Sequence, residues 1–179
     1  MDGKGVGRAY GQFVGKELVE YVSKVFGLSD KKEDTFIGGL SMGGFGAIHT
    51  GLKYWDTFDR MFGLSSAFII HNIKNRQEGF KDNIADYDYY VSVFGNLDEL
   101  ENSEHNPERL IKRLKEDHME VQPIFMACGS EDFLLHENRD FYDFLRKENV
   151  RVDYRESSGI HDWKFWNENL EPAIQWMLT

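Results

Sequence analysis

The chain has 179 residues, of which 41% are hydrophobic and 29% are charged, so one domain with a hydrophobic core is expected. Its formal net charge of −10 disfavours nucleic-acid binding, because the phosphates carry charge of the same sign. The single cysteine, Cys128, excludes an internal disulfide, and its apolar neighbours indicate a small core residue. No membrane-length apolar run and no signal peptide are visible, so we expect a cytoplasmic protein without a membrane partner.

The first predicted elements are a loop and a helix. Glycines recur through residues 1–12, which is typical of a loop. Apolar residues then recur at helical spacing over residues 14–26, and Gly27 ends this helix. A charged turn at residues 29–34 leads into a short apolar strand over residues 35–40.

The strand runs directly into Gly39-Leu40-Ser41-Met42-Gly43, and an apolar-periodic helix follows. This is a G-x-S-x-G motif between a strand and a helix, the context that a nucleophile elbow requires. Flanking glycines remove the Cβ atoms that would collide where strand and helix come close, so the serine hydroxyl is exposed. The N–H groups that start the helix can face an oxyanion. The motif predicts Ser41 as a nucleophile, although the same residues also occur at junctions with an incidental serine.

The rest of the chain alternates strands with helices. Three more apolar strands are predicted, at residues 60–65, 123–129 and 150–156. The helices between and after them include one that starts at Pro107 behind the capping residue Asn106. This alternation predicts a single α/β domain over residues 1–179, with a parallel sheet covered on both faces. Residues 66–105 lack a clean period, and we read them as an irregular insertion over the site or a plain surface excursion.

A serine nucleophile needs a base, and the base needs an orienting carboxylate. In an open α/β sheet such groups lie where the strands end at their carboxyl termini. Asp132 follows the strand at 123–129, and His161 follows the strand at 150–156. The chain order of serine, acid and histidine is the order expected of α/β-hydrolases.

Each partner has an alternative reading. Glu131 lies beside Asp132 and could be the acid instead. Asp162 is read as the cap of the last helix, and His49, on the helix after the elbow, as a packing or surface residue. The other histidines show no ligand spacing, so no metal site is predicted.

Three motifs together resemble one known family. They are GGLSMGG at 38–44, CGSEDFL at 128–134 and GIHDW at 159–163. In this order the chain resembles the esterase D-type putative esterase family of α/β-hydrolases. That family includes tributyrin esterases, acetyl and feruloyl esterases and S-formylglutathione hydrolases, and the chain is most similar to the bacterial tributyrin-esterase branch. The resemblance runs from about residue 13 to the C-terminus.

The resemblance implies a serine esterase that needs no cofactor. It implies Ser41 as nucleophile, Asp132 as acid, His161 as base and the backbone N–H of Met42 in the oxyanion hole. Two aromatic residues near the site could help to line an apolar acyl or aryl pocket, namely Phe45 and Trp163. Core packing is the more common role of any one aromatic residue.

The nucleophile comes early for this family, whose members have a much longer segment before it. Only 40 residues precede Ser41, and no strand is predicted among them before residue 35. We therefore expect a partial α/β-hydrolase fold with about four strands, mainly parallel and flanked by helices. The elbow strand would become an exposed apolar edge, which predicts a homo-oligomer formed through that edge. A second oxyanion donor would have to come from residues 3–11 or from another subunit.

The sequence thus predicts a serine carboxylic-ester hydrolase acting on short-chain acyl or aryl esters. A thioesterase or a peptidase with the same residues is an alternative, because the shape of the pocket sets the leaving group. An alternative of another class is a catalytically impaired, self-associating hydrolase remnant with a binding or structural role, which the early nucleophile suggests.

Overall fold

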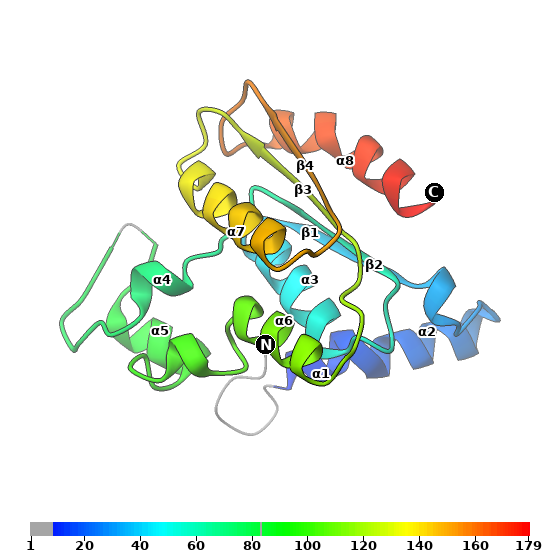
Figure 1. Cartoon of the computed structure of the whole chain (residues 1–179), viewed down its shortest axis with the longest axis horizontal. Coiled ribbons are helices and arrows are strands. Elements are labelled where there is room, and N and C mark those ends of the chain that lie inside the picture. The colour runs from blue at the N-terminus through cyan, green and yellow to red at the C-terminus, as the bar shows by residue number, and fades with distance from the viewer. Residues whose placement is uncertain (1–8, 83) are drawn as a thin grey trace.

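A computed structural model describes residues 9–82 and 84–179 of the chain. Its centre is a four-stranded sheet in the order β1-β2-β3-β4 (Figure 1). The strands are β1 Phe36–Leu40, β2 Arg60–Leu64, β3 Ile124–Gly129 and β4 Val152–Ser157. All three pairings are parallel. The predicted α/β class, with a parallel sheet of about four strands flanked by helices, is confirmed.

The register aligns the carboxyl ends of the strands. Leu40 pairs with Leu64, and Leu64 pairs with Ala127. Gly129, at the end of β3, pairs with Ser157 at the end of β4. The loops that follow the four strands therefore leave the sheet along one edge, which is where chemistry is expected in an open α/β sheet.

Helices cover both faces of the sheet. The helices α3 Met42–Lys53, α6 Pro107–Glu116 and α7 Leu135–Lys147 share one large core with side chains of alternate strand positions, Met61, Ile124 and Met126 among them. On the other face α8, Trp163–Met177, packs on the intervening positions. Those positions include Phe62, Leu64, Phe125 and Ala127. Because both faces are covered, β3 reads as a continuous buried run rather than an alternating one.

The helix before β1 begins earlier than the sequence predicted. The helix α1 Tyr10–Gln12, a π-helical turn Phe13–Glu17 and α2 Leu18–Phe26 follow one another directly. The loop predicted over 1–12 is therefore wrong for its last three residues, because the N–H of Phe13 already donates to the Ala9 carbonyl at 2.9 Å. Residues 1–8 lie outside the described part of the chain. Gly27 ends α2 as predicted, with a φ of 64°.

The segment between β2 and α6 is partly helical. It contains α4 Ile70–Ile73, α5 Tyr87–Phe94 and a 3₁₀ turn, Leu100–Asn102. The predicted helix start at Asn106 is confirmed, since its side chain accepts the N–H of Glu108. None of the helices in the described residues combines the length and the apolar character that crossing a membrane requires.

Candidate active site

Ser41 lies at a strained turn between β1 and α3. Its φ of 51° and ψ of −121° fall outside the regions that an L-residue ordinarily adopts. The backbone is held there by its neighbours: the N–H donates to the Leu64 carbonyl at 2.8 Å, and the carbonyl accepts the N–H of Ala67 at 3.1 Å. The same carbonyl accepts the first N–H bonds of α3, from Gly44 and Phe45. Such an imposed conformation is typical of functional positions.

The glycines around Ser41 allow this turn. A Cβ atom added at Gly39 would collide with the backbone of Gly43. The strand and the first turn of α3 therefore approach more closely than any side chain would permit. This is the steric reason for the G-x-S-x-G spacing at this junction.

His161 lies between Ser41 and Asp132. Its Nε2 is 2.9 Å from the Ser41 Oγ, and its Nδ1 is 2.9 and 3.1 Å from the two carboxylate oxygens of Asp132. The Asp132 side chain is fully buried, and its Oδ1 also accepts the N–H of Leu134 at 2.8 Å. An ionised carboxylate only accepts, so Nδ1 carries the proton and Nε2 accepts the hydroxyl proton of Ser41. The three residues that the sequence singled out are brought together.

Glu131, the alternative acid, points elsewhere. Its carboxylate accepts the backbone N–H of Gly159 at 2.6 Å and a hydroxyl from Ser130 at 2.7 Å. The Ser130 hydroxyl and then the Gly159 N–H lower the pKa of this exposed carboxyl. Glu131 thus holds the loop that leads to His161, and the structure places Asp132, not Glu131, against the imidazole.

The N–H of Met42 is the first of α3. The first-turn N–H groups of a helix have no intrahelical acceptor, and they carry the positive end of the helix dipole. The N–H of Met42 is therefore available beside Ser41. The sequence predicted that residues 3–11 or another subunit would supply a second oxyanion donor. Residues 3–8 of that segment lie outside the described part of the chain.

The two residues predicted to contact substrate differ in position. Phe45 is 2% exposed and packs against Phe68 and Phe94, so its role is core packing and the expectation for it needs correction. It points inward because it lies on the face of α3 that covers the sheet. Trp163 is exposed at the start of α8, and its ring packs on Trp166, which in turn contacts the His161 ring.

Asn138 holds the backbone segment that binds the Ser41 carbonyl, and it was not identified from the sequence. It is fully buried on α7, and its amide accepts the N–H of Ser66 and donates to the Ser66 carbonyl at 2.9 Å. Ser66 directly precedes Ala67, whose N–H binds the Ser41 carbonyl. The only sign of this role in the sequence is that Asn138 is a polar residue on an amphipathic helix. Many exposed residues share that feature, so it does not single out Asn138.

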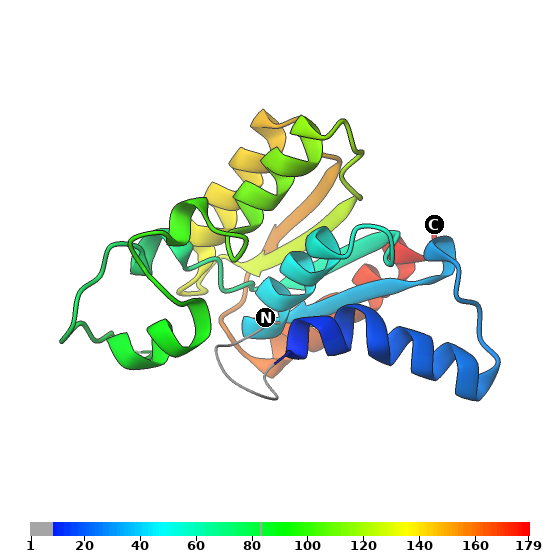
Figure 2. The same cartoon turned by 90° about the horizontal axis from the view of Figure 1, so that it is seen from below.

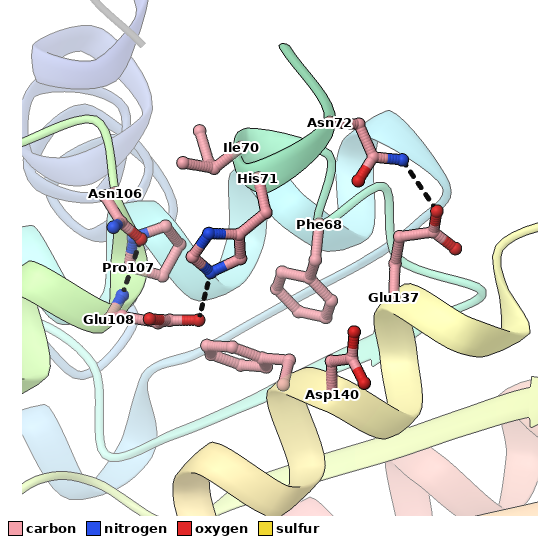
Figure 3. Close-up of a pocket in the computed structure, with 10 residues that line it drawn as sticks. Phe68, Ile70, His71, Asn72, Asn106, Pro107, Glu108, Glu137 and Asp140 are labelled. Atoms are coloured by element: carbon pink, nitrogen blue, oxygen red, sulfur yellow. Dashed lines mark hydrogen bonds and ion pairs between the residues drawn. The ribbon is translucent and has the colours of Figure 1, made fainter. Parts of the chain in front are cut away.

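Two cavities lie near this edge of the sheet, and they differ in size. One, shown in Figure 3, has a volume of about 20 Å³ and lies between α4, α6 and α7. Its walls are tied by contacts of His71 with Glu108 at 2.8 Å and of Asn72 with Glu137 at 2.7 Å. This cavity has room for about one water molecule, which is too little for a substrate. The contacts in its walls join the three helices. The other cavity has a volume of about 330 Å³ and lies between Met42 and the segment 84–94.

His49 is a buried histidine outside this site. It is 2% exposed, and burial lowers its pKa to about 4. Its Nε2 contacts the Glu104 carbonyl at 2.9 Å, and the ring stacks against Phe45. It is therefore a packing residue, as one of the two readings of the sequence had it. Across residues 9–82 and 84–179, no three His, Cys, Asp or Glu side chains are grouped as a metal ion would require.

Comparisons with known proteins agree on one family. The family model described as "Putative esterase" matches residues 2–177. An acetyl esterase from Caldicellulosiruptor saccharolyticus is 45% identical over 168 residues, which are 94% of this chain and 63% of that protein.

Two solved structures from Staphylococcus aureus have the same fold. One is the substrate-bound fluorophosphonate-binding serine hydrolase FphF, with a TM-score of 0.83 and 31% identity over 97% of this chain and 65% of that chain. The other is the apoenzyme of the S-formylglutathione hydrolase FrmB, with a TM-score of 0.83 and 30% identity over 100% of this chain and 67% of that chain. The chain therefore spans about two thirds of the length of these relatives.

Proposed function

The chain belongs to the Putative esterase family of α/β-hydrolases, and we propose on this basis that it is a serine carboxylic-ester hydrolase acting on short-chain acyl or aryl esters. The observation that carries the proposal is the hydrogen-bonded series from Ser41 through His161 to Asp132. Family membership alone gives the class of reaction, whereas this geometry supplies a nucleophile, a base and an orienting acid within hydrogen-bond reach. A cytoplasmic location stays a prediction from the sequence.

The first half of the reaction follows from the proton positions. The Nε2 of His161 takes the Ser41 proton while Oγ forms a bond to the ester carbonyl carbon. The Met42 N–H stabilises the oxyanion that develops on the carbonyl oxygen. The ester C–O bond then breaks, and the proton on Nε2 passes to the departing alcohol oxygen.

The second half uses the same groups. His161 removes a proton from water, which attacks the acyl carbon bound to Ser41 Oγ, and the carboxylic acid is released as Oγ regains its proton. Throughout, the buried carboxylate of Asp132 keeps Nδ1 protonated and stabilises the charged imidazole. Trp163, exposed beside the His161 side of the site, is proposed to contact substrate.

The test is hydrolysis of p-nitrophenyl acetate and butyrate by the purified chain, with Ser41→Ala and His161→Ala beside it. We expect turnover by the unmodified protein and none above background by either variant. Circular dichroism and melting temperature serve as controls for folding. Turnover that survives in Ser41→Ala would overturn the proposal, as would an inert unmodified protein.

The second candidate, a catalytically impaired remnant, is not favoured. A remnant has no need to keep three separate segments of the chain aligned at one point. The distances from His161 to Ser41 and Asp132 lie within the hydrogen-bond reach that general-base catalysis needs.

A further inference from the structure

An apolar cavity of about 330 Å³ opens beside Met42, the residue that follows the nucleophile. Met42 and Ile69 contribute to it from the edge of the sheet, and the remaining walls come from the segment 84–94. Those walls are made by Ile84, Ala85, Asp86, Tyr89, Tyr90 and Phe94. Its size falls at the lower end of the range for small-molecule sites, about 300–1,000 Å³. It is far larger than the two-carbon acyl group of an acetate ester requires.

One wall of this cavity is held by Asp82. Its Oδ1 accepts the backbone N–H groups of Ile84 at 2.8 Å and of Ala85 at 2.9 Å. The hydroxyl of Tyr90, on α5, lies 2.9 Å from Oδ2 and 3.0 Å from Oδ1 of the same carboxylate. Tyr90 itself is 1% exposed, so its ring is fixed in the core. The wall residues are therefore anchored to α5 through a single carboxylate.

The carboxylate that forms this anchor is ionised near neutral pH. Partial burial acts to raise the pKa of the Asp82 carboxyl, but the N–H groups of Ala85 and Ile84 and the Tyr90 hydroxyl outweigh it, and the pKa is lowered. The carboxylate thus stays ionised through the range in which esterases are assayed. A hydrogen bond between a hydroxyl and an ionised carboxylate is also stronger than one between neutral groups.

The position of the cavity decides which part of an ester it receives. The departing alcohol must lie near the Nε2 of His161, because that atom supplies its proton. The carbonyl oxygen must face the Met42 N–H. The acyl chain is then directed away from His161, and the cavity that Met42 lines receives it, since neither His161 nor its neighbours contribute to that cavity.

We propose that this cavity is the acyl-chain pocket and that the Asp82–Tyr90 hydrogen bond sets its width, so that the longer of the short acyl chains, such as hexanoyl, are preferred over acetyl. The inference rests on the proposed function and refines its substrate class. Each methylene that becomes fully buried contributes about a fourfold gain in binding, so the preference should rise steeply from acetate to hexanoate. Tyr90 acts on the pocket wall, not on the reacting atoms, and is a positioning residue.

The test compares p-nitrophenyl hexanoate with p-nitrophenyl acetate. Tyr90→Phe keeps the buried ring and removes only the hydroxyl. We expect its kcat/KM for hexanoate to fall about tenfold, mainly through KM, while kcat/KM for acetate changes less than twofold. Ile84→Trp, at an exposed position of the lining, should narrow the pocket and lower the hexanoate value in the same way. The matched control is Tyr154→Phe, which removes a hydroxyl that contacts Glu156 on β4 and should change neither ester.

The outcomes separate cleanly. A fall for both esters by the same factor in Tyr90→Phe, or no change for either, overturns the inference while leaving the proposed esterase activity intact. If the unmodified chain hydrolyses neither ester, the proposed function fails. The pocket is then tested by measuring how tightly each ester binds. Calorimetry with methyl hexanoate and methyl acetate on Ser41→Ala protein should give tighter binding of the hexanoate, weakened about tenfold by adding Tyr90→Phe. Equal binding of the two esters would overturn the inference.

Discussion

Glu131 accepts a hydrogen bond from the backbone N–H of Gly159 at 2.6 Å, whereas its neighbour Asp132 accepts a hydrogen bond from Nδ1–H of His161 at 2.9 Å. The two adjacent carboxylates thus hold the same loop at different points. One is exposed and binds the backbone before the histidine, and the other is buried and binds the imidazole itself.

This division predicts unequal effects of two isosteric changes. Asp132→Asn should lower kcat by about 10⁴-fold, because a neutral amide neither fixes the Nδ1–H tautomer nor stabilises the imidazolium. Glu131→Gln should lower it less than about tenfold, since its amide oxygen can still accept the Gly159 N–H. Steady-state hydrolysis of p-nitrophenyl butyrate measures both. The reverse order of severity would move the acid to Glu131.

A second prediction concerns Asn138 and stability. Asn138→Ala would leave the buried N–H of Ser66 without its amide acceptor, while the Ser66 carbonyl would keep the N–H of Phe68 as a donor. We expect the free energy of unfolding to fall by about 1–3 kcal/mol, the cost of one unsatisfied buried donor. Urea unfolding measures it. Asn72→Ala, which removes an amide contact of 2.7 Å between the exposed Asn72 and the half-buried Glu137, is the control and should cost under about 0.5 kcal/mol. Equal effects of the two changes would contradict the structural role of Asn138.

Much of the fold could be predicted from periodicity and capping. The strands before and after the elbow, the Asn106-Pro107 helix start and the cap formed by Asp162 depend on local chemistry. The candidate triad could be located because parallel strands end along one edge, so the residue after each strand is known to lie near the others.

The rest depends on tertiary contacts that no local pattern encodes. Phe45 and Trp163 are both aromatic residues near motif positions, yet one is buried in the core and the other is exposed. The pocket wall held by Asp82 depends on a tyrosine eight residues later on a separate helix. Asn138 binds the backbone of a residue 72 positions away.

A third prediction follows from the burial of His49. Because burial lowers its pKa to about 4 from the ordinary histidine value of 6.5, the unfolded chain binds this proton more readily than the folded chain. The stability contribution of the neutral ring is therefore complete above about pH 6.5 and is lost as the pH falls towards 4. The full loss amounts to about 3 kcal/mol.

Urea unfolding at pH 7.5 and pH 4.5 tests this. His49→Phe keeps an aromatic ring beside Phe45 and removes the titrating group. Because exposed carboxyls also titrate in this range, the quantity to compare is the stability change between the two pH values in each protein. It should be smaller in His49→Phe by about 2–3 kcal/mol. An equal change in both proteins would rule out His49 as a source of acid sensitivity.

The fourth prediction concerns the free edge of the sheet. Within the described residues β1 pairs only with β2. Thr35 and Ser41 direct their backbone bonds to the β2 side, so by alternation Phe36, Gly38 and Leu40 direct theirs to the free edge. An edge strand without a charged residue is a template for pairing with another chain. We therefore propose that the chain forms a homo-oligomer through β1.

The helix beside this edge strengthens the argument. Figure 2 shows α2 running alongside β1, and no residue of α2 is buried. An apolar cavity of about 580 Å³, lined partly by Leu18, Val22 and Phe36, separates the two elements. Exposed apolar surface of this kind marks an interaction site more often than an isolated exposed side chain does. A second copy that pairs with β1 would also cover α2.

Sedimentation velocity over a range of concentrations tests the association. The unmodified chain should sediment as a dimer or larger species, and Val25→Glu with Phe26→Glu, both at exposed α2 positions, should shift it towards monomer. Lys112→Gln with Lys147→Gln lowers the net charge by the same amount on α6 and α7 and should leave association unchanged, because those helices lie away from the edge. A monomer at every concentration would refute the proposal. Equal dissociation in both double variants would assign the effect to net charge, since electrostatic repulsion between copies then suffices without any contact at β1.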